Sequence, residues 1–403
     1  MTEAKKQICI VGGGFGGLYT ALRLDELSWE NTGKPQITLV DKNDRFLFSP
    51  LLYELLSGEM QAWEIAPSYI ELLKNTEIKF SQTSVKSLDI GQKQLKLDDD
   101  TELNCDRLVI ATGGNTPLDF VPGAATYAIP FRTLEDVYLL AEKLKSLEQS
   151  STNYIRIAIV GGGYSGVELA CKLADRLGER GRIRIIERGD NILRNSPEFN
   201  RETAKKALEA RKVWLDLETE IQRIEADNLT LVYKNQIDTI PVDLVLWTVG
   251  TKVSPFIQQL PLPQDNSGYL KTNSYLQVEG ESHIYALGDV ATSQDAEGQQ
   301  IPKTAQAAIQ QADYCAWNIW ASLTGRPLLP FRYQPLGEMM TLGVDNATLS
   351  GLGLKLEGIP AHLVRRLIYL YRLPTRKHQL NVGLNWLAQP LLQFLQQGEG
   401  VRF

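Results

Sequence analysis

The chain has 403 residues, 43% of them hydrophobic, so it can bury a large core divided between two or three domains. Its formal net charge of −6 excludes the strongly basic balance of a general nucleic-acid-binding protein, and we expect no nucleic-acid partner. The four cysteines are scattered without a C-x-x-C pair, so we expect neither a metal site nor a dithiol redox centre.

A glycine-rich loop, GGGFGG, follows a short apolar run at residues 8–11. The apolar run predicts a buried strand, and Leu18–Leu27 after the loop predicts a helix. A helix that begins directly after such a loop points its N-terminal N–H groups at a phosphate. The alternative is a plain tight turn. The residues expected to hold a dinucleotide here are Gly12, Gly14, Phe15, Gly16 and Gly17.

The stretch Gln36–Asp41 predicts a second parallel strand that ends in an acid. A carboxylate there can accept hydrogen bonds from a ribose, so we expect Asp41 to bind an adenosine. The alternative is a solvated acid at a strand end.

The next segment contains a loop at residues 46–54 and a predicted helix at Trp63–Leu73. The alternating pattern at residues 78–106 then predicts a small antiparallel excursion from the parallel sheet. A buried strand returns the chain to the glycine turn at Thr112 and Gly113.

The same order of elements repeats after a polar linker at residues 147–153. A strand at 155–160, the loop GGGYSG and a helix at 167–177 precede a strand at 183–187 that ends in Glu187. Alternating strands at 221–241 and a buried strand that ends at Gly250 complete the copy. Such a duplication predicts two dinucleotides, one in each half of the chain.

The third part of the chain returns to the first domain. Residues 283–289 predict a strand that ends in Gly288-Asp289. A helix at 304–323 and a hairpin-like segment at 331–344 are predicted to follow it. We therefore predict an α/β protein with two Rossmann-like dinucleotide-binding domains. The expected boundaries are 1–125 with 276–345 for the first domain, 126–275 for the second and 346–403 for a C-terminal segment.

The chain contains, in this order, the motifs GGGFGG, ATGG, GGGYSGVE, WTVG and ALGDVA. With these motifs the chain resembles the two-dinucleotide-binding-domain flavoproteins of the glutathione-reductase type. The segments SPLLYE, KTAQAAIQQ and FRYQPLGEMMTLG are similar to those of type II NAD(P)H:quinone oxidoreductases. Residues 52–73 resemble the plant and cyanobacterial branch that acts as demethylphylloquinone reductase. The resemblance implies FAD in the first half and NADH or NADPH in the second. It also implies non-proton-pumping reduction of a membrane naphthoquinone.

The resemblance also implies roles for single residues. FAD would contact Lys42, Val85, Thr112, Gly113, Gly288 and Asp289 in addition to the first loop. NAD(P)H would contact Gly161, Gly163, Tyr164, Ser165, Gly166, Glu187, Arg188 and Gly250. The quinone would contact Pro50, Gln306, Gln310 and Lys377, although Lys377 could instead meet lipid phosphates.

Three of the expected site residues carry a chemical role. Gln306 and Gln310 are one helical turn apart, so their amides share a face and could bind a quinone carbonyl; the alternative is a polar helix face. Glu168 lies in the first turn of the second loop's helix and would orient the nicotinamide or relay a proton. The alternative is an acid that the helix N-terminus stabilises.

The choice between NADH and NADPH stays open in the sequence. Glu187 favours NADH, because an acid at that strand end binds the 2′-hydroxyl and repels a 2′-phosphate. Arg188 could accommodate the phosphate, and the resemblance to the branch also points to NADPH.

The C-terminal segment is basic, with seven basic and two acidic residues from Gly353 to Phe403. His362–Leu373 predicts an amphipathic helix. Its apolar stripe contains Leu363, Val364, Leu367, Leu370 and Tyr371, and the opposite side contains Arg365, Arg366, Tyr369 and Arg372. Such a helix suits an anionic membrane interface. No signal peptide or membrane span is expected, so we predict a peripheral protein on the cytoplasmic side of a plasma or thylakoid membrane. The alternative is that the stripe packs on the body or in a homodimer.

Two other functions stay possible on the sequence alone. One is an NAD(P)H-dependent flavin reductase of a small electron-carrier protein. The other is a non-catalytic flavoprotein that senses nucleotides.

Overall fold

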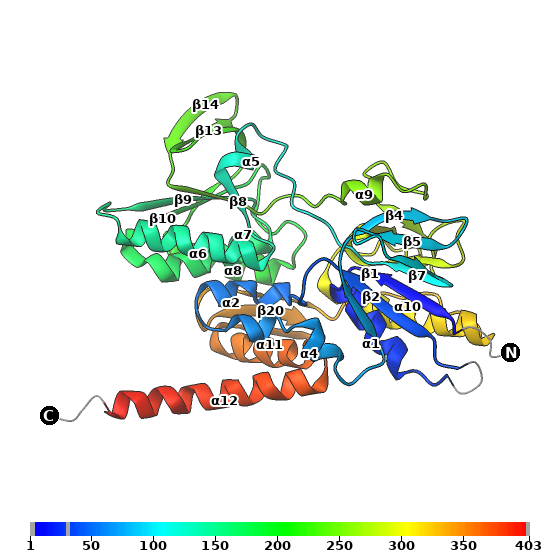
Figure 1. The fold of residues 1–403 in the computed structure, drawn as a ribbon. Helices are drawn as coiled ribbons and strands as arrows, with labels where there is room; N and C mark the ends of the chain where they lie inside the picture. Colours follow the sequence, from blue (N-terminus) through cyan, green and yellow to red (C-terminus); the bar gives the residue numbers. More distant parts are fainter. Residues whose placement is uncertain (1–4, 30–32, 400–403) are drawn as a thin grey trace. The chain divides into compact units, whose positions relative to one another are not determined.

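The computed structural model describes residues 5–29 and 33–399, and the side chains of these residues as far as 388. Two compact units divide the chain. Unit 1 comprises residues 1–47, 66–115 and 251–334, and unit 2 comprises residues 48–65, 116–250 and 335–403. Each unit is built around its own parallel sheet, as the predicted α/β fold requires (Figure 1).

Unit 1 contains a five-stranded sheet in the order β17-β7-β1-β2-β3. Its strands are β1 (Gln7–Val11), β2 (Gln36–Asp41), β3 (Lys79–Gln82), β7 (Arg107–Ile110) and β17 (Ile284–Ala286). All neighbouring strands are parallel, so their carboxyl ends lie along one edge. That edge carries the first glycine loop, the acid of β2 and the Gly-Asp turn after β17.

Side chains of β1 alternate between the two faces of this sheet. Ile10 faces α1 (Phe15–Glu26), which packs on α10 (Ala305–Thr324). Cys9 belongs to the core cluster that includes the small antiparallel sheet on the other face. The small antiparallel sheet comprises β4 (Val85–Asp89), β5 (Gln94–Leu97) and β6 (Glu102–Asn104). The remaining short elements of unit 1 are α4 (Tyr69–Leu73), α9 (Pro255–Gln258), β16 (Leu270–Thr272), the 3-10 turn η3 (Gly288–Val290) and β18 (Ala291–Ser293).

Unit 2 repeats the plan with a parallel sheet in the order β11-β10-β9-β15-β8. Its strands are β8 (Ala128–Pro130), β9 (Ile155–Val160), β10 (Gly181–Ile186), β11 (Trp214–Asp216) and β15 (Leu244–Trp247). The antiparallel sheet comprises β12 (Thr219–Ile224), β13 (Asn228–Tyr233) and β14 (Gln236–Pro241). The helices are α5 (Ala124–Tyr127), α6 (Leu134–Gln149), α7 (Tyr164–Leu177), the 3-10 turn η2 (Gly178–Arg180) and α8 (Glu198–Ala210).

The end of the chain adds a three-stranded antiparallel sheet and two helices to unit 2. They are β19 (Glu338–Thr341), β20 (Ala347–Gly351), β21 (Leu354–Glu357), α11 (Gly358–Arg372) and α12 (Arg376–Glu399). The short segments from the N-terminal half are η1 (Ser49–Leu51), α2 (Leu52–Leu56) and α3 (Ala62–Ile65). Helix α12 is the long red helix in Figure 1. In the described part of the chain, no helix is both long and apolar enough to cross a bilayer.

Three local predictions were wrong in part. The helix predicted at 63–73 is broken into α3 and α4 around Pro67, because a proline disfavours helical backbone at the residue before it. The predicted linker at 147–153 overlaps the last turn of α6. Residues 79–82 form β3, a parallel neighbour of β2, and do not belong to the antiparallel excursion.

Helix α11 is amphipathic as predicted, but the side that carries Arg365 faces the interior of unit 2. Leu363, Leu367 and Tyr371 of α11 are 56%, 64% and 75% exposed, whereas Arg365 is fully buried. The sequence placed Arg365 on the basic side of this helix, but its burial keeps it from contact with lipid headgroups. Arg365 instead forms an ion pair inside unit 2, which is described below.

Candidate functional site

Backbone hydrogen bonds fix the first glycine loop to the edge of the unit 1 sheet. The N–H of Gly12 donates to the carbonyl of Val40 at 2.8 Å. A Cβ atom at Gly17 would lie 1.8 Å from the Gly12 carbonyl oxygen, so α1 can approach the strand only with glycine at this position. A Cβ atom at Gly14, in contrast, would meet nothing within 4 Å. The loop is therefore packed on its inner side and open on its outer side.

Asp41 closes the loop from the neighbouring strand. Its carboxylate accepts hydrogen bonds from the N–H of Gly13 at 2.6 Å and of Asn43 at 2.8 Å. The hydroxyl of Tyr69 donates to the Gly13 carbonyl at 2.8 Å. With its backbone held in this way and its outer side open before a helix N-terminus, the loop fits the pyrophosphate and ribose of a dinucleotide.

The second loop in unit 2 has the same construction. The N–H of Gly161 donates to Ile186 at 2.9 Å, and a Cβ atom at Gly166 would lie 1.9 Å from the Gly161 carbonyl oxygen. Glu187 accepts from the N–H of Gly162 at 2.8 Å, as Asp41 does from Gly13. A Cβ atom at Gly163 would again meet nothing within 4 Å. The two predicted dinucleotide loops are therefore equivalent in hydrogen bonding as well as in sequence.

The Gly-Asp turn after β17 depends on a residue that the sequence analysis missed. The N–H of Gly288 donates at 2.9 Å to the side-chain oxygen of Gln311, which is buried in α10. This bond holds the turn, in which Gly288 has a φ of 74°, against the helix. Only the tertiary packing distinguishes Gln311 from its two predicted neighbours, because all three glutamines lie within two turns of one helix.

The two predicted glutamines are each engaged within unit 1. The amide of Gln310 donates to the carbonyl of Gln334 at 2.9 Å and accepts from its N–H at 3.0 Å. The oxygen of Gln306 accepts from the Tyr333 hydroxyl at 3.0 Å. These bonds orient both amides and join α10 to residues 333–334.

Glu168 lies in a buried polar cluster of unit 2. It is 6% exposed and accepts from the N–H of Thr341 at 2.9 Å. Arg365 comes within 3.7 Å of Glu168, pairs with the buried Glu54 and donates to the Pro50 carbonyl at 2.9 Å. Residues from two other parts of the chain, 50–54 and 168, thus meet around the Arg365 guanidinium.

Burial decides the ionisation of Glu168. It raises the pKa of this carboxyl from 4.5 to about 7, and the nearby Glu54 carboxylate acts in the same direction. Arg365 and the Thr341 N–H act against the shift, but they do not cancel it. In contrast, the closer contact with Arg365 leaves the pKa of Glu54 below its usual value. Glu168 can therefore hold or release a proton near neutral pH, while Glu54 stays ionised.

The other predicted residues are distributed over both units, and Pro50, which was expected in the first domain, lies in unit 2. Lys42, Thr112, Arg188, Gly250 and Lys377 are exposed, whereas Val85, Gly113, Asp289, Tyr164 and Ser165 are half-buried. Tyr164 bonds to Glu338 and accepts from the Ser196 hydroxyl at 2.7 Å. Burial is the main cause of the raised pKa of Tyr164, so its hydroxyl stays protonated. Pro50 and Lys377 belong to unit 2, and Gln306 and Gln310 belong to unit 1.

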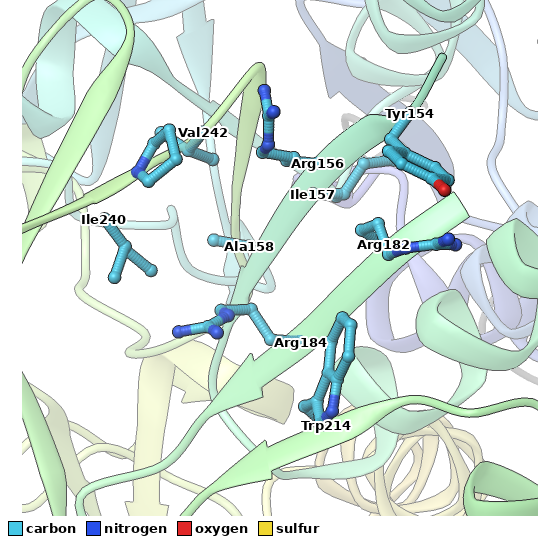
Figure 2. A pocket seen from close by; sticks show the side chains of 10 residues that line it. Tyr154, Arg156, Ile157, Ala158, Arg182, Arg184, Trp214, Ile240 and Val242 are labelled. Atoms are coloured by element: carbon cyan, nitrogen blue, oxygen red, sulfur yellow. The ribbon is translucent and has the colours of Figure 1, made fainter. Parts of the chain in front are cut away.

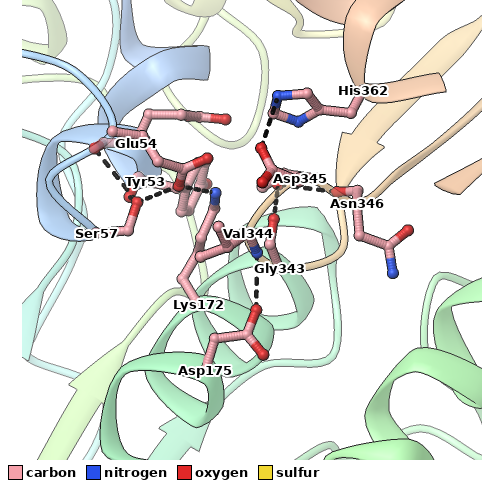
Figure 3. A network of polar contacts seen from close by, with 12 residues as sticks. Tyr53, Glu54, Ser57, Lys172, Asp175, Gly343, Val344, Asp345, Asn346 and His362 are labelled. Atoms are coloured by element: carbon pink, nitrogen blue, oxygen red, sulfur yellow. Dashed lines mark hydrogen bonds and ion pairs between the residues drawn. The ribbon is translucent and has the colours of Figure 1, made fainter. Parts of the chain in front are cut away.

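One further cluster contains groups that can bind a metal. Ligand atoms of Glu59, Asp345 and His362 lie within 4.8 Å of one another, and His362 Nε2 is 3.6 Å from Asp345 Oδ1 (Figure 3). The buried ammonium of Lys172 already pairs with Glu59. The cluster is thus an ion-pair network in which a lysine supplies the positive charge.

A family model described as pyridine nucleotide-disulphide oxidoreductase matches residues 6–312. The chain belongs to the pyridine nucleotide-disulphide oxidoreductase family. It is 61% identical over 400 residues to "Demethylphylloquinone reductase NdbB" of Synechocystis sp., covering 98% of this chain and 99% of that protein. It is 44% identical to "Alternative NAD(P)H-ubiquinone oxidoreductase C1, chloroplastic/mitochondrial" of Arabidopsis thaliana, covering 96% and 81%. Both relatives confirm the predicted resemblance.

The solved structures confirm the fold of this pyridine nucleotide-disulphide oxidoreductase. "Structure of NDH2 from plasmodium falciparum in complex with NADH" matches with a TM-score of 0.84 at 19% identity, covering 95% of this chain and 98% of that chain. The two-loop architecture predicted from the sequence is therefore the architecture of known members of the fold.

Proposed function

We propose that the protein is an FAD-dependent NAD(P)H:quinone oxidoreductase that reduces demethylphylloquinone or a similar naphthoquinone. The observation that carries the proposal is the pair of equivalent dinucleotide loops in a chain 61% identical to a demethylphylloquinone reductase over nearly its full length. Two such loops serve an enzyme that binds one redox dinucleotide permanently and a second as substrate.

The first loop would hold FAD. Its open outer side at Gly14, the N-terminus of α1 and the carboxylate of Asp41 fit a pyrophosphate and a ribose. When bound, FAD would supply the two-electron redox chemistry that links the nicotinamide to the quinone. Gly288 and Asp289, positioned through Gln311, would complete the binding site in unit 1.

The second loop would hold NAD(P)H. Both oxygens of Glu187 accept backbone N–H groups, from Gly162 and from Gly189 at 2.7 Å, which fixes the carboxylate at the strand end where a ribose binds. The exposed guanidinium of Arg188 is the next side chain. The balance between these two charges decides the preference between NADH and NADPH.

Glu168 would supply a proton to the quinone. Reduction of a quinone to a quinol takes up two protons with its two electrons, and a buried carboxylic acid with a pKa of about 7 suits that transfer at neutral pH. Arg365 and the Thr341 N–H would keep this carboxyl group in place. Gln306 and Gln310 would hydrogen-bond the quinone, and Pro50 and Lys377 would lie along its entry.

The exposed apolar side chains of α11 and α12 would rest on the bilayer in which the quinone dissolves. Leu363, Leu367 and Tyr371 of α11 share one exposed stripe. Leu380, Leu384 and Leu387 form another on α12, at 67%, 64% and 77% exposure. Surfaces of this kind mark an interface, and interfacial helices bury such stripes among lipid headgroups.

An anaerobic titration tests the reaction. NADH or NADPH should bleach the flavin, and a naphthoquinone should restore its absorbance, with the faster nicotinamide giving the preference. Bleaching without reoxidation by quinone would favour a reductase of an electron-carrier protein, and no bleaching would favour a nucleotide sensor. Either outcome would overturn the proposal.

Flotation with vesicles that contain anionic lipid tests the membrane contact. The triple variant Leu363→Glu/Leu367→Glu/Tyr371→Ser should stay at the bottom of the gradient, where the unchanged protein floats. Equal flotation of both would place the lipid contact elsewhere. A change in oligomeric state without a change in flotation would assign the stripe to a homodimer.

A further inference from the structure

Unit 2 contains a pocket of about 330 Å³ on one face of its parallel sheet, near the amino-terminal ends of β9 and β10. Its floor includes Ala158, and its charged lining comes from Arg156, Arg182 and Arg184 (Figure 2). These residues share a face because they alternate along the paired strands β9 and β10. The predicted nucleotide chemistry of the chain uses none of them.

The charges in this pocket are only partly compensated. Arg184 lies 3.2 Å from Asp216, and Arg156 lies 3.9 Å from Asp243. Within the described part of the chain, Arg182 forms no ion pair, and its guanidinium donates to the carbonyls of Glu179 and Gly181.

The strand register places two of these positive charges next to each other. Arg156 and Arg182 are direct partners on neighbouring strands, and like charges in that position repel. An anion bound in the pocket would relieve the repulsion.

Two aromatic rings flank the arginines. The guanidinium of Arg182 lies 3.8 Å from the centre of the Tyr154 ring. Trp214 of β11 is the strand partner of Arg184, and Figure 2 shows that both side chains line the pocket. Arg182 covers one face of Tyr154, but both rings are about half exposed, so each keeps surface that a planar ligand can contact.

The pocket is separate from the loop expected to bind NAD(P)H. Arg156 precedes Gly161 by five residues along an extended strand, which at about 3.3 Å per residue places them roughly 16 Å apart. The loop follows the carboxyl ends of the strands, and the pocket lies toward their amino ends. A ligand in the pocket would therefore leave the loop accessible.

We propose that this pocket is a second nucleotide site that binds a ligand with one phosphate group and one planar base, of the nucleoside monophosphate class. Guanidinium groups pair with phosphate through two parallel hydrogen bonds, and the rings of Trp214 and Tyr154 offer stacking surfaces for the base. The volume lies at the lower end of the range of small-molecule pockets, about 300–1,000 Å³, which suits a mononucleotide better than a dinucleotide.

Calorimetric titration of the flavin-loaded protein with AMP tests the proposal, with NAD⁺ present at saturation to fill the dinucleotide loop. AMP should bind at least tenfold more tightly than adenosine or inorganic phosphate, because only AMP uses both the arginines and the rings. Arg182→Gln should weaken AMP binding roughly 10- to 100-fold, the range for loss of a charge-assisted hydrogen bond. Trp214→Leu should weaken AMP but leave the binding of phosphate unchanged.

Arg223→Gln is the matched control, since Arg223 is an exposed arginine of the same unit outside the pocket and should leave AMP binding unchanged. Retention of flavin and the thermal midpoint confirm that each variant is folded. Absence of AMP binding, or its loss when NAD⁺ is added, would overturn the proposal. So would equal affinities for AMP and inorganic phosphate, which would reduce the pocket to a surface for simple anions.

Discussion

Replacement of Arg365 by methionine should be among the most destabilising single changes in unit 2. The side chain is fully buried, pairs with Glu54 and donates to the Pro50 carbonyl. Methionine fills a similar volume without the charge. Glu54, itself 1% exposed, would be left as a carboxylate with its main partner removed.

The size of the effect follows from that unpaired charge. Removal of one partner of a buried ion pair costs about 3–5 kcal/mol of the free energy of unfolding. The cost should increase with pH. Without Arg365, the pKa of Glu54 and that of Glu168 would both rise, so the folded variant would bind protons more tightly than the unfolded chain. Its stability would then fall as the pH rises through those values.

Urea unfolding of Arg365→Met and of the unchanged protein, followed by circular dichroism at pH 5 and pH 8, measures both effects. Arg366→Met is the matched control, because Arg366 is half-buried on the same helix and lies 4.4 Å from the centre of the Trp386 ring. It should cost less than about 1 kcal/mol. The double variant Glu54→Leu/Arg365→Met should be more stable than Arg365→Met, since it removes the orphaned carboxylate.

A cost for Arg365→Met no larger than that for Arg366→Met at both pH values would refute the reasoning. It would mean that water or a rearranged side chain replaces the guanidinium without loss. A cost that decreases from pH 5 to pH 8 would refute the assignment of the effect to ionised Glu54.

Three further predictions concern the two loops and the proton. Gly17→Ala should give folded protein depleted of flavin, seen as a lower ratio of 450 nm to 280 nm absorbance, because the added Cβ atom meets the Gly12 carbonyl at 1.8 Å; normal flavin content would contradict the packing. Glu168→Gln should lower the kcat for quinol formation about 100-fold and remove the fall in rate above pH 7 that deprotonation of Glu168 causes, so an unchanged pH profile would exclude it as the acid. Glu187→Ala should raise the ratio of kcat/KM for NADPH to that for NADH about tenfold, whereas a constant ratio would show that this carboxylate does not choose the nicotinamide.

The dinucleotide loops were predictable because each is contiguous in sequence. A buried strand, three glycines at fixed spacing and an amphipathic helix specify the local turn, and the next strand brings its terminal acid beside that turn. Asp41 and Glu187 accordingly make the same backbone hydrogen bond in the two units, with Gly13 and Gly162.

The points at which a predicted helix is interrupted were only partly predictable from the sequence. The apolar spacing of residues 63–73 fits one helix, but Pro67 and the hydrogen bond from the Glu71 N–H to the Ser68 hydroxyl start a new helix at Tyr69. The pattern of hydrophobic residues does not carry that information. The proline and the capping serine do, and they outweigh the pattern because they act on backbone hydrogen bonds.

The sequence by itself determined the two-loop architecture and the existence of an amphipathic C-terminal helix. Only the tertiary structure decided which side of that helix faces the protein. An amphipathic pattern defines two faces, but the partner of Arg365 is Glu54, 311 residues away in the chain. A buried arginine is stable only where such a carboxylate and a carbonyl meet it, and no local pattern records that meeting. The ion pair turns the arginine inward and leaves the leucines of the same helix exposed.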